Sequence, residues 1–253
     1  MGEPVTSSGE LVTLEVDAEG VARVLMQDAD GRNALSPAFI EQFLSCLQRL
    51  NAARDARVAI LLGLPDVFCS GGDLKTLGLM AGELPLDEVR QAGAVLDVRV
   101  PLIAAMEGHA IGGGLALGLC ADILVIARES RYGCTFMNLG FTPGMGTTRL
   151  LEHAVTPALA HEMLYTGQAF KGSHFEGRGG FNYILPRDQV RPKAEELAAR
   201  IAEKPAHALE TLKRALSIPR RQAFEQSRTI EGFMHEISFR EPGTLRMIEE
   251  NYD

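Results

Sequence analysis

Hydrophobic and polar residues alternate in two short segments near the start of the chain, at Leu11–Val16 and Val21–Met26. Alternation of this kind is typical of β-strands that bury one face. Glu19-Gly20 separates the two segments, and a short connection that contains glycine favours a hairpin. The sequence therefore predicts an antiparallel pair of strands.

An amphipathic helix is predicted to begin at Ser36. Serine is a favoured N-cap residue, and Pro37 suits the first turn, where a backbone N–H has no intrahelical partner. The apolar residues that follow recur at the spacing of one helix face; they are Phe39, Ile40, Phe43, Leu44, Leu47 and Leu50.

Three later segments are apolar throughout: Val58–Leu62, Leu102–Met106 and Ile123–Ala127. Unbroken apolar runs of this length are typical of parallel strands that are buried on both faces. A helical stretch is predicted around Leu86–Val98, and a small-residue helix that ends near Cys120 separates the second and third runs. The order strand, helix, strand predicts an α/β chain up to about residue 150.

Beyond Pro143 the pattern is mainly helical, with one short strand predicted at Tyr183–Leu185. The predicted helices are Thr147–His153, Pro157–Tyr165, Val190–Ala202, Ala206–Leu216, Gln222–Phe239 and Thr244–Asn251. We therefore expect a core at residues 1–190 and a C-terminal helical region at residues 191–253.

The composition excludes several classes of protein. The 253 residues contain no run of about 18 apolar residues, so no membrane-spanning helix is expected. The formal net charge is −8, which argues against nucleic acids and anionic membranes as partners, because both need a clustered basic patch. Residues 1–9 lack a basic start before an apolar stretch, so they do not resemble a signal peptide.

The four cysteines lie far apart, without a CxxC pair and without a histidine at ligand spacing; they are Cys46, Cys69, Cys120 and Cys134. This pattern indicates free thiols in a reducing compartment rather than disulfides or a metal site. We therefore expect a cytoplasmic protein with no metal and no organic cofactor.

Two glycine turns carry the candidate chemistry: Gly71-Gly72 and Gly112-Gly113-Gly114. Each is expected before a helix, where backbone N–H groups and the helix dipole favour negative charge. The turns are 113 − 72 = 41 positions apart, and their N–H groups could converge on one oxygen as an oxyanion hole. The alternative is that the glycines only allow close packing of helix on strand. A nucleotide loop is disfavoured, because the spacing differs from G-x-G-x-x-G and no Walker lysine follows.

Four ordered motifs resemble those of the crotonase (enoyl-CoA hydratase/isomerase) superfamily: residues 32–35, 68–75, 105–117 and 140–146. The resemblance implies a spiral of ββα units with a C-terminal helical trimerisation region, assembled as a trimer or hexamer. By position it also implies that the N–H groups of Gly72 and Gly113 form the oxyanion hole. Ala34 and Leu35 would line the channel for a pantetheine arm.

The sequence departs from the hydratase pattern at two positions. Hydratases carry two glutamates where this chain has Ala116 and Phe136, so nothing at those positions can activate water. Apolar residues there would instead desolvate a carboxylate on the substrate, which is costly for an unpaired charge. Loss of CO2 relieves that cost, and an oxyanion hole then stabilises the dienolate that forms.

A narrower resemblance agrees with this argument. Residues 108–114, 136–146 and Met234-His235-Glu236 resemble the decarboxylase branch that acts in polyketide β-branching. The resemblance implies conversion of a 3-methylglutaconyl group, held on the phosphopantetheine arm of an acyl carrier protein, into a 3-methylcrotonyl thioester.

In that branch a lysine and a C-terminal histidine are associated with the site. His235 matches the histidine, which would donate a proton to the dienolate or position the carboxylate; alternatively, it is a buried histidine bonded to a backbone carbonyl. Lys75 is the candidate lysine, although it lies closer to Gly72 than the branch usually places it. It either holds the departing carboxylate or has no chemical task.

Two other functions stay open. One is a dehydratase or isomerase of the same fold, with Asp73 or His235 as the base, although Asp73 is also a plausible helix cap. The other is a catalytically inactive crotonase-like protein used for binding. The intact glycine turns argue against the second.

Overall fold

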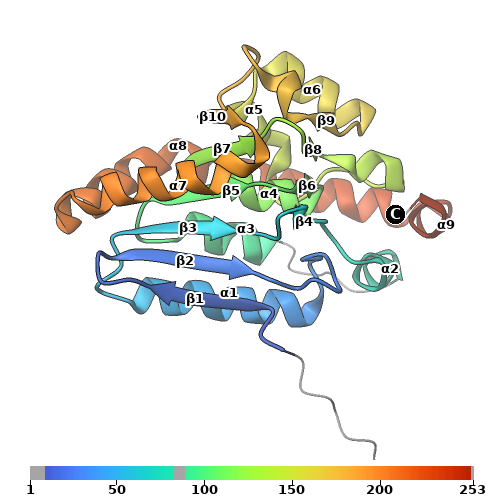
Figure 1. Cartoon of the computed structure of the whole chain (residues 1–253). Coiled ribbons are helices and arrows are strands. Elements are labelled where there is room, and N and C mark those ends of the chain that lie inside the picture. Colours follow the sequence, from blue (N-terminus) through green and yellow to red (C-terminus); the bar gives the residue numbers. More distant parts are fainter. Residues whose placement is uncertain (1–8, 83–88, 252–253) are drawn as a thin grey trace, which may run out of the picture.

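The computed structural model describes residues 9–82 and 89–251 (Figure 1). A six-stranded sheet has the strand order β1-β2-β3-β5-β7-β10. Its strands are β1 (Val12–Val16), β2 (Val21–Met26), β3 (Val58–Leu62), β5 (Leu102–Met106), β7 (Ile123–Ala127) and β10 (Tyr183–Leu185). The pair β1/β2 is antiparallel and every other pair is parallel, which confirms the predicted hairpin and the predicted buried strands.

Helices cover both faces of this sheet, and successive side chains of β3 point alternately into the two core clusters. Val58, Ile60 and Leu62 belong to one core cluster, which includes the buried side of α7 (Arg187–Ala202). Ala59 and Leu61 belong to the other cluster, which includes the helices behind the sheet. Those helices are α1 (Pro37–Ala52), α3 (Val89–Leu96) and α4 (Gly113–Leu119). A strand between two apolar layers needs an unbroken apolar sequence.

A second, four-stranded sheet was not predicted from the sequence. Its order is β4 (Val67–Cys69), β6 (His109–Ile111), β8 (Arg131–Gly133) and β9 (Phe170–Lys171). None of these strands exceeds three residues, which is too short for a periodic pattern to appear. The strands β3 to β8 therefore alternate between the two sheets, and this repeat confirms the expected spiral of ββα units.

The N-terminus of α1 has the predicted cap. The Ser36 Oγ accepts a hydrogen bond from the Phe39 N–H at 3.2 Å, and Pro37 occupies the first turn. Phe39, Phe43 and Leu47 are buried in the core. Ile40 belongs to the predicted apolar face but lies at its border, partly buried.

The remaining helices are α2 (Leu74–Gly82), α5 (Thr147–Ala154), α6 (Pro157–Thr166), α8 (Ala206–Ser238) and α9 (Thr244–Asn251), with short 3-10 turns at Thr135–Leu139 (η1) and Gly172–Phe175 (η2). In Figure 1 the C-terminal helix α9 lies beside α2, and the two helices are in contact. Within the described ranges, no helix is long and apolar enough to span a membrane.

The prediction of two helices at residues 206–216 and 222–239 was wrong, because α8 is continuous across Pro219. Proline removes one helical hydrogen bond, but tertiary contacts hold both sides of this position. Lys213 and Arg220 both pair with Asp122, the lysine at 2.5 Å. Arg221 pairs with Asp97. These contacts fix α8 to the spiral on both sides of the proline.

Candidate active site

The two glycine turns meet at one edge of the smaller sheet. Gly71-Gly72 follows β4 and Gly112-Gly113 follows β6, and these two strands are parallel neighbours. Parallel neighbours end at the same edge, so the turns come together there. A cavity of about 810 Å³ opens beside them, and all four glycines line it.

Backbone hydrogen bonds fix the positions of both turns. The Leu35 N–H donates to the Gly71 carbonyl oxygen at 2.7 Å, and the Gly112 N–H donates to the Gly133 carbonyl oxygen at 2.8 Å. Gly71 has a φ of +96°, and a Cβ there would lie 2.7 Å from the Ile111 carbonyl oxygen. The first turn therefore requires glycine for both conformation and space.

The glycines of the second turn have different tasks. A Cβ on Gly114 would lie 2.1 Å from the Cys69 carbonyl oxygen, so this glycine allows α4 to pack on β4. A Cβ on Gly113 would meet only the side-chain ends of Leu35 and Met145. Gly113 is the first residue of α4 and lines the cavity. The packing interpretation thus holds for Gly114, while Gly72 and Gly113 both line the cavity.

Asn33 supports the first turn from behind. The sequence motif at residues 32–35 includes it and predicts that this segment lines the channel, but Asn33 is not among the described residues that line the cavity. Its side chain is fully buried, and its backbone is in the left-handed conformation with a φ of +54°. The Asn33 Nδ2 donates to the carbonyl oxygens of Met26 at 3.1 Å and Phe68 at 3.0 Å. The thiol of Cys69 donates to the Asn33 carbonyl oxygen at 2.9 Å. Asparagine tolerates this backbone conformation better than most residues, so it joins the ends of β2 and β4 without strain.

Apolar side chains form a wall of the cavity beside the glycine turns. Phe136 lines the cavity and packs edge-on against Phe141, with ring centroids 5.9 Å apart. Leu35, Leu77 and Met145 complete this wall. Apolar side chains therefore make up much of the lining beside the turns, together with polar ones such as Thr76 and Thr135.

Not every residue predicted for the pocket lines it. Phe136 and Leu35 do, whereas Ala116 is fully buried within α4 and Ala34 is buried in the preceding loop. Neither alanine is among the lining residues described. In this structure Phe136 alone, of the two positions where hydratases carry glutamate, presents its side chain to the cavity.

His235 lies behind the wall rather than in it. It is not among the described residues that line the cavity, and its Nε2 lies 2.9 Å from the Thr142 carbonyl oxygen. A carbonyl oxygen only accepts, so Nε2 donates. The ring packs edge-on against Phe141 and Phe239. Desolvation by burial lowers the pKa of His235, opposed by the hydrogen bond to Thr142, and the imidazole is neutral near pH 7.

Glu231 fastens the same segment one helical turn before His235. Its Oε2 accepts from the Gly146 N–H at 2.6 Å, and its Oε1 accepts from the Thr148 N–H at 2.9 Å. These N–H groups belong to the start of α5, where a carboxylate is favoured. Glu231 and His235 therefore hold both ends of the segment that places Met145 in the cavity wall.

Lys75 is exposed on α2 and is not among the described lining residues. Asp73, just before it, caps α2: its Oδ1 accepts from the Thr76 N–H at 3.1 Å. The structure thus agrees with the capping interpretation of Asp73. It brings together Gly72, Gly113 and Phe136, and it leaves Lys75 outside this group.

Gln91, on α3, is a lining residue that the sequence analysis missed. Its side chain is 6% exposed, and its Oε1 has no hydrogen-bond partner among the described residues. No motif marks a lone glutamine in a helical stretch, so sequence reasoning had no signal for it.

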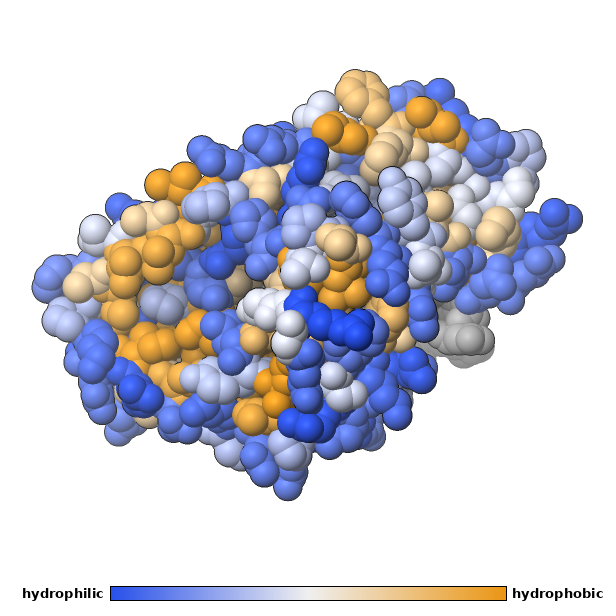
Figure 2. Space-filling view, turned by 90° about the horizontal axis from the view of Figure 1, so that it is seen from above, coloured by the Kyte–Doolittle hydropathy of each residue, from blue (hydrophilic) through white to orange (hydrophobic). Residues whose placement is uncertain are grey.

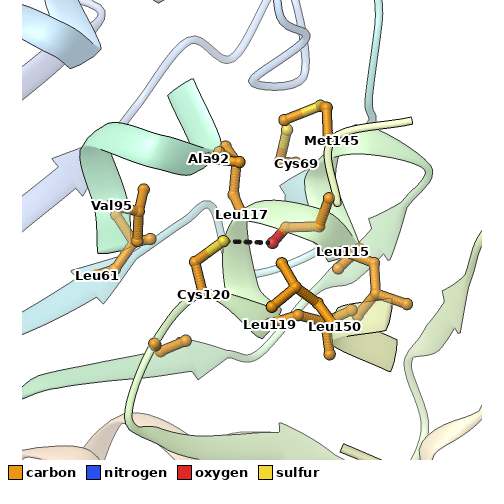
Figure 3. Close-up of a cluster of buried hydrophobic side chains, with 14 of the residues drawn as sticks. Leu61, Cys69, Ala92, Val95, Leu115, Leu117, Leu119, Cys120, Met145 and Leu150 are labelled. Carbon is orange, nitrogen blue, oxygen red and sulfur yellow. Dashed lines mark hydrogen bonds between the residues drawn. The ribbon is translucent and has the colours of Figure 1, made fainter. Parts of the chain in front are cut away.

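The four cysteines are all buried and free, as predicted. Burial raises the pKa of Cys69, Cys120 and Cys134 to about 12, and that of Cys46 to about 11. The Cys120 thiol donates to the Ala116 carbonyl oxygen at 3.3 Å, and Figure 3 shows Cys120 inside the hydrophobic cluster. Across the part of the chain that the structure describes, no three histidine, cysteine or acidic side chains gather as metal ligands.

Comparison with known proteins places this geometry in a family. Residues 17–248 match the family model described as enoyl-CoA hydratase/isomerase. The bacillaene synthase decarboxylase PksI of Bacillus subtilis (strain 168) is 36% identical over 231 residues, 91% of this chain and 92% of that protein. Enoyl-CoA hydratase domain-containing protein 2, a mitochondrial protein of Bos taurus, is 34% identical over 190 residues, 73% of this chain and 64% of that protein.

Solved structures give the same relationship. A structure described as a dehydratase/decarboxylase enzyme couple involved in polyketide β-branching has a TM-score of 0.91 and 34% identity, over 96% of this chain and 99% of that chain. The ECH2 decarboxylase domain of CurF from Lyngbya majuscula has a TM-score of 0.90 and 33% identity, over 96% of this chain and 100% of that chain.

Proposed function

The chain belongs to the enoyl-CoA hydratase/isomerase (crotonase) family, and from this premise we propose that it decarboxylates a 3-methylglutaconyl-type thioester carried by an acyl carrier protein. One observation carries the proposal. The two glycine turns lie beside an apolar wall in which Phe136 stands where hydratases of the family carry a glutamate.

The relatives support the decarboxylase assignment. PksI and the CurF domain are both named as decarboxylases, and each is similar to this chain over more than nine-tenths of its length. Polyketide β-branching is the stated context of a structure with similarly close likeness. The same context supports a carrier-protein substrate and a branched product.

The proposed step needs no water and no added reagent. The thioester oxygen binds between the N–H groups of Gly72 and Gly113. The bond between C4 and the terminal carboxylate breaks, and its electron pair forms a C3–C4 double bond. The C2–C3 double bond shifts to C1–C2, and the charge arrives on the thioester oxygen as CO2 leaves. Removing one donor of such an oxyanion site costs about 3–4 kcal/mol of transition-state stabilisation.

The apolar wall favours the loss of CO2. A carboxylate beside Phe136 and Phe141 loses hydration without gaining an opposite charge, which is costly. Among the lining side chains that the structure describes, Glu41 is the one ionisable group, and it lies on the exposed side of α1. It therefore neither pairs with the carboxylate nor sits where hydratases place their glutamates.

Protonation of the dienolate completes the reaction, and His235 and Lys75 stay the predicted catalytic residues. The neutral His235 holds the Thr142 carbonyl in this structure. For direct proton transfer, its Nε2 must release that carbonyl and reach the cavity. Its alternative role is to position the segment from Thr142 to Gly146. Lys75 would need a comparable movement of α2.

Assembly as a homotrimer, or as a hexamer, is part of the proposal. The helix α8 exposes apolar side chains at helical spacing: Leu212, Leu216, Ile230, Phe233 and Ile237. The face seen in Figure 2 also carries several hydrophobic patches between hydrophilic residues. Exposed apolar stripes of this kind are typical of subunit contacts. The mass in solution, measured by light scattering for the wild type and for Phe233→Asp, tests this assembly: a monomeric wild type would contradict it.

The decisive experiment is mass spectrometry of 3-methylglutaconyl on an acyl carrier protein, with and without the enzyme. The proposal expects loss of the mass of one CO2. Loss or gain of one water would indicate a dehydratase or hydratase, and no change with any thioester would favour an inactive binding protein. Loss of activity in His235→Ala, retained in His235→Gln, would favour positioning over proton transfer. Full activity in Lys75→Ala would remove that lysine from the site.

A further inference from the structure

Gln91 is the cavity-lining residue whose burial calls for an explanation. Among the residues that the structure describes, five side-chain atoms are buried without a hydrogen-bond partner, and of these only the Oε1 of Gln91 belongs to a lining residue. An acceptor left unpaired in this way destabilises a folded protein, so each such group calls for an explanation, and a bound ligand is one.

The surroundings of Gln91 do not call for a polar residue. Its neighbours on α3, Ala92 and Val95, are fully buried, and Figure 3 shows them within the hydrophobic cluster that includes Leu61 and Leu117. A leucine or methionine at position 91 would fill the same space without an unpaired amide. Gln91 therefore serves the cavity rather than the core.

We propose that the Gln91 carboxamide hydrogen-bonds to the distal carboxylate of the acyl chain and thereby selects acyl groups that carry one. The inference rests on the proposed function and names its specificity residue. A half-turn of the amide exchanges its N–H and oxygen positions, so Nε2 can donate to a carboxylate that lies in the cavity.

In the lining that the structure describes, the distal carboxylate would meet the neutral amide of Gln91 rather than a cation, since Lys75 lies outside this lining. A lysine or arginine would stabilise the carboxylate by its charge, and this stabilisation would be lost as CO2 leaves. An amide orients the carboxylate with a hydrogen bond but leaves its charge uncompensated beside Phe136 and Phe141, so the ground state stays poorly solvated.

The position of α3 is compatible with this contact. The helix packs against α4, whose first residue is Gly113, and Gln91 and Gly113 line the same cavity. A glutaconyl chain places its carboxylate four carbon–carbon bonds from the thioester carbon, which is roughly 5 Å in extended form. An acyl chain that reaches from Gly113 to Gln91 would lie within this cavity.

Binding of two stable pantetheine conjugates tests the inference. Both have an amide in place of the thioester; one carries a glutaryl chain that ends in a carboxylate, and the other a pentanoyl chain that ends in a methyl group. We expect Gln91→Met to weaken glutaryl binding about 10- to 100-fold, the loss of a hydrogen bond to a charged group, and to leave pentanoyl binding unchanged. Gln91→Glu should weaken glutaryl binding further by repulsion.

Thermal unfolding provides the control for the fold. Gln91→Met should melt at or above the wild-type temperature, because it removes an unpaired buried acceptor. If Gln91→Met does not fold, binding of the two conjugates can be compared in Gln91→Leu and Gln91→Glu instead. Equal effects on both conjugates, or none on either, would overturn the inference.

Failure of the inference can be told from failure of the proposed function. Suppose that the wild type releases no CO2 but prefers the glutaryl conjugate, and that Gln91→Met lacks this preference. This result would refute decarboxylation and retain the role of Gln91. Release of CO2 that is unaffected by Gln91→Met would retain decarboxylation and refute the role of Gln91.

Discussion

The two walls of the cavity are built on different principles. The glycine wall consists of backbone, held by hydrogen bonds to Leu35 and Gly133 and confined by neighbouring carbonyl groups. The side-chain wall comes from several elements, among them Phe136, Phe141 and Gln91. A backbone wall tolerates almost no substitution, so it can stay the same while the reaction changes. The side-chain wall is where one member of the family can differ from another.

Substitution of Gly114 should have the largest effect on stability. In Gly114→Val the Cβ would approach the Cys69 carbonyl oxygen to 2.1 Å, and backbone cannot move aside as a side chain can. We expect a loss of about 3 kcal/mol or more in the free energy of unfolding, measured by urea denaturation.

Gly113→Ala is the matched control within the same turn. Its Cβ would meet only the Leu35 and Met145 side chains, which can shift. We expect a stability loss below about 1.5 kcal/mol. Equal losses in Gly113→Ala and Gly114→Val would show that the two glycines are not different in kind.

Phe136→Glu places a negative charge in the side-chain wall. This charge should repel the carboxylate of the proposed substrate, which the apolar wall would only desolvate. Two like charges about 6 Å apart at an effective dielectric constant of about 20 repel by about 3 kcal/mol. We expect kcat/KM for CO2 release to fall about 100-fold. Phe136→Leu, which keeps the wall apolar, should stay within about 10-fold of wild type. A Phe136→Glu enzyme with wild-type activity would contradict the role given to this wall.

Glu231→Ala tests the support behind the side-chain wall. The variant leaves the buried N–H of Gly146 and the N–H of Thr148 without their acceptor, which should destabilise the fold by about 2 kcal/mol in urea unfolding. Glu231→Gln keeps one acceptor oxygen and should lose about half as much. If Glu231→Ala unfolds like the wild type, the clamp on Met145 is not needed.

Substitution of His235 should have the smallest effect on stability, and this effect should appear only when the free energy of unfolding is measured at different pH values. Burial lowers its folded-state pKa below the ordinary value of 6.5. Between those two values the unfolded chain binds a proton that the folded chain does not, so stability falls as the pH drops below 6.5 and is unaffected above it. His235→Gln should therefore lose less stability than wild type between neutral pH and pH 5, by urea unfolding. A steeper loss in the variant would mean that the histidine is charged in the fold.

The sequence was most informative where a pattern repeats. The six strands of the large sheet, the Ser36 cap and the two glycine turns all follow from periodicity or from residue types with one main use. The smaller sheet was missed because its strands are two or three residues long. The continuity of α8 was missed because ion pairs from Lys213 and Arg220 to Asp122 override the local preference of Pro219.

The site divides in the same way. Gly72, Gly113 and Phe136 were predicted, since motif position is enough to bring them to one cavity. The burial of Ala116 within α4, the distance of Lys75 from the lining and the contact of His235 with Thr142 all depend on packing between distant segments. Gln91 carries no motif, and its significance appears only once its burial and its unpaired oxygen are known.

The buried thiols have a chemical consequence for the proposed thioester substrate. An acyl group passes from one sulfur to another only by attack of a thiolate. Cys69 stands two residues before Gly71, yet its sulfur is fully covered and bonded to the Asn33 carbonyl, with a pKa of about 12. The other three thiols are equally covered. With the proposed thioester substrate, the burial of these thiols would disfavour transfer of the acyl group to the enzyme.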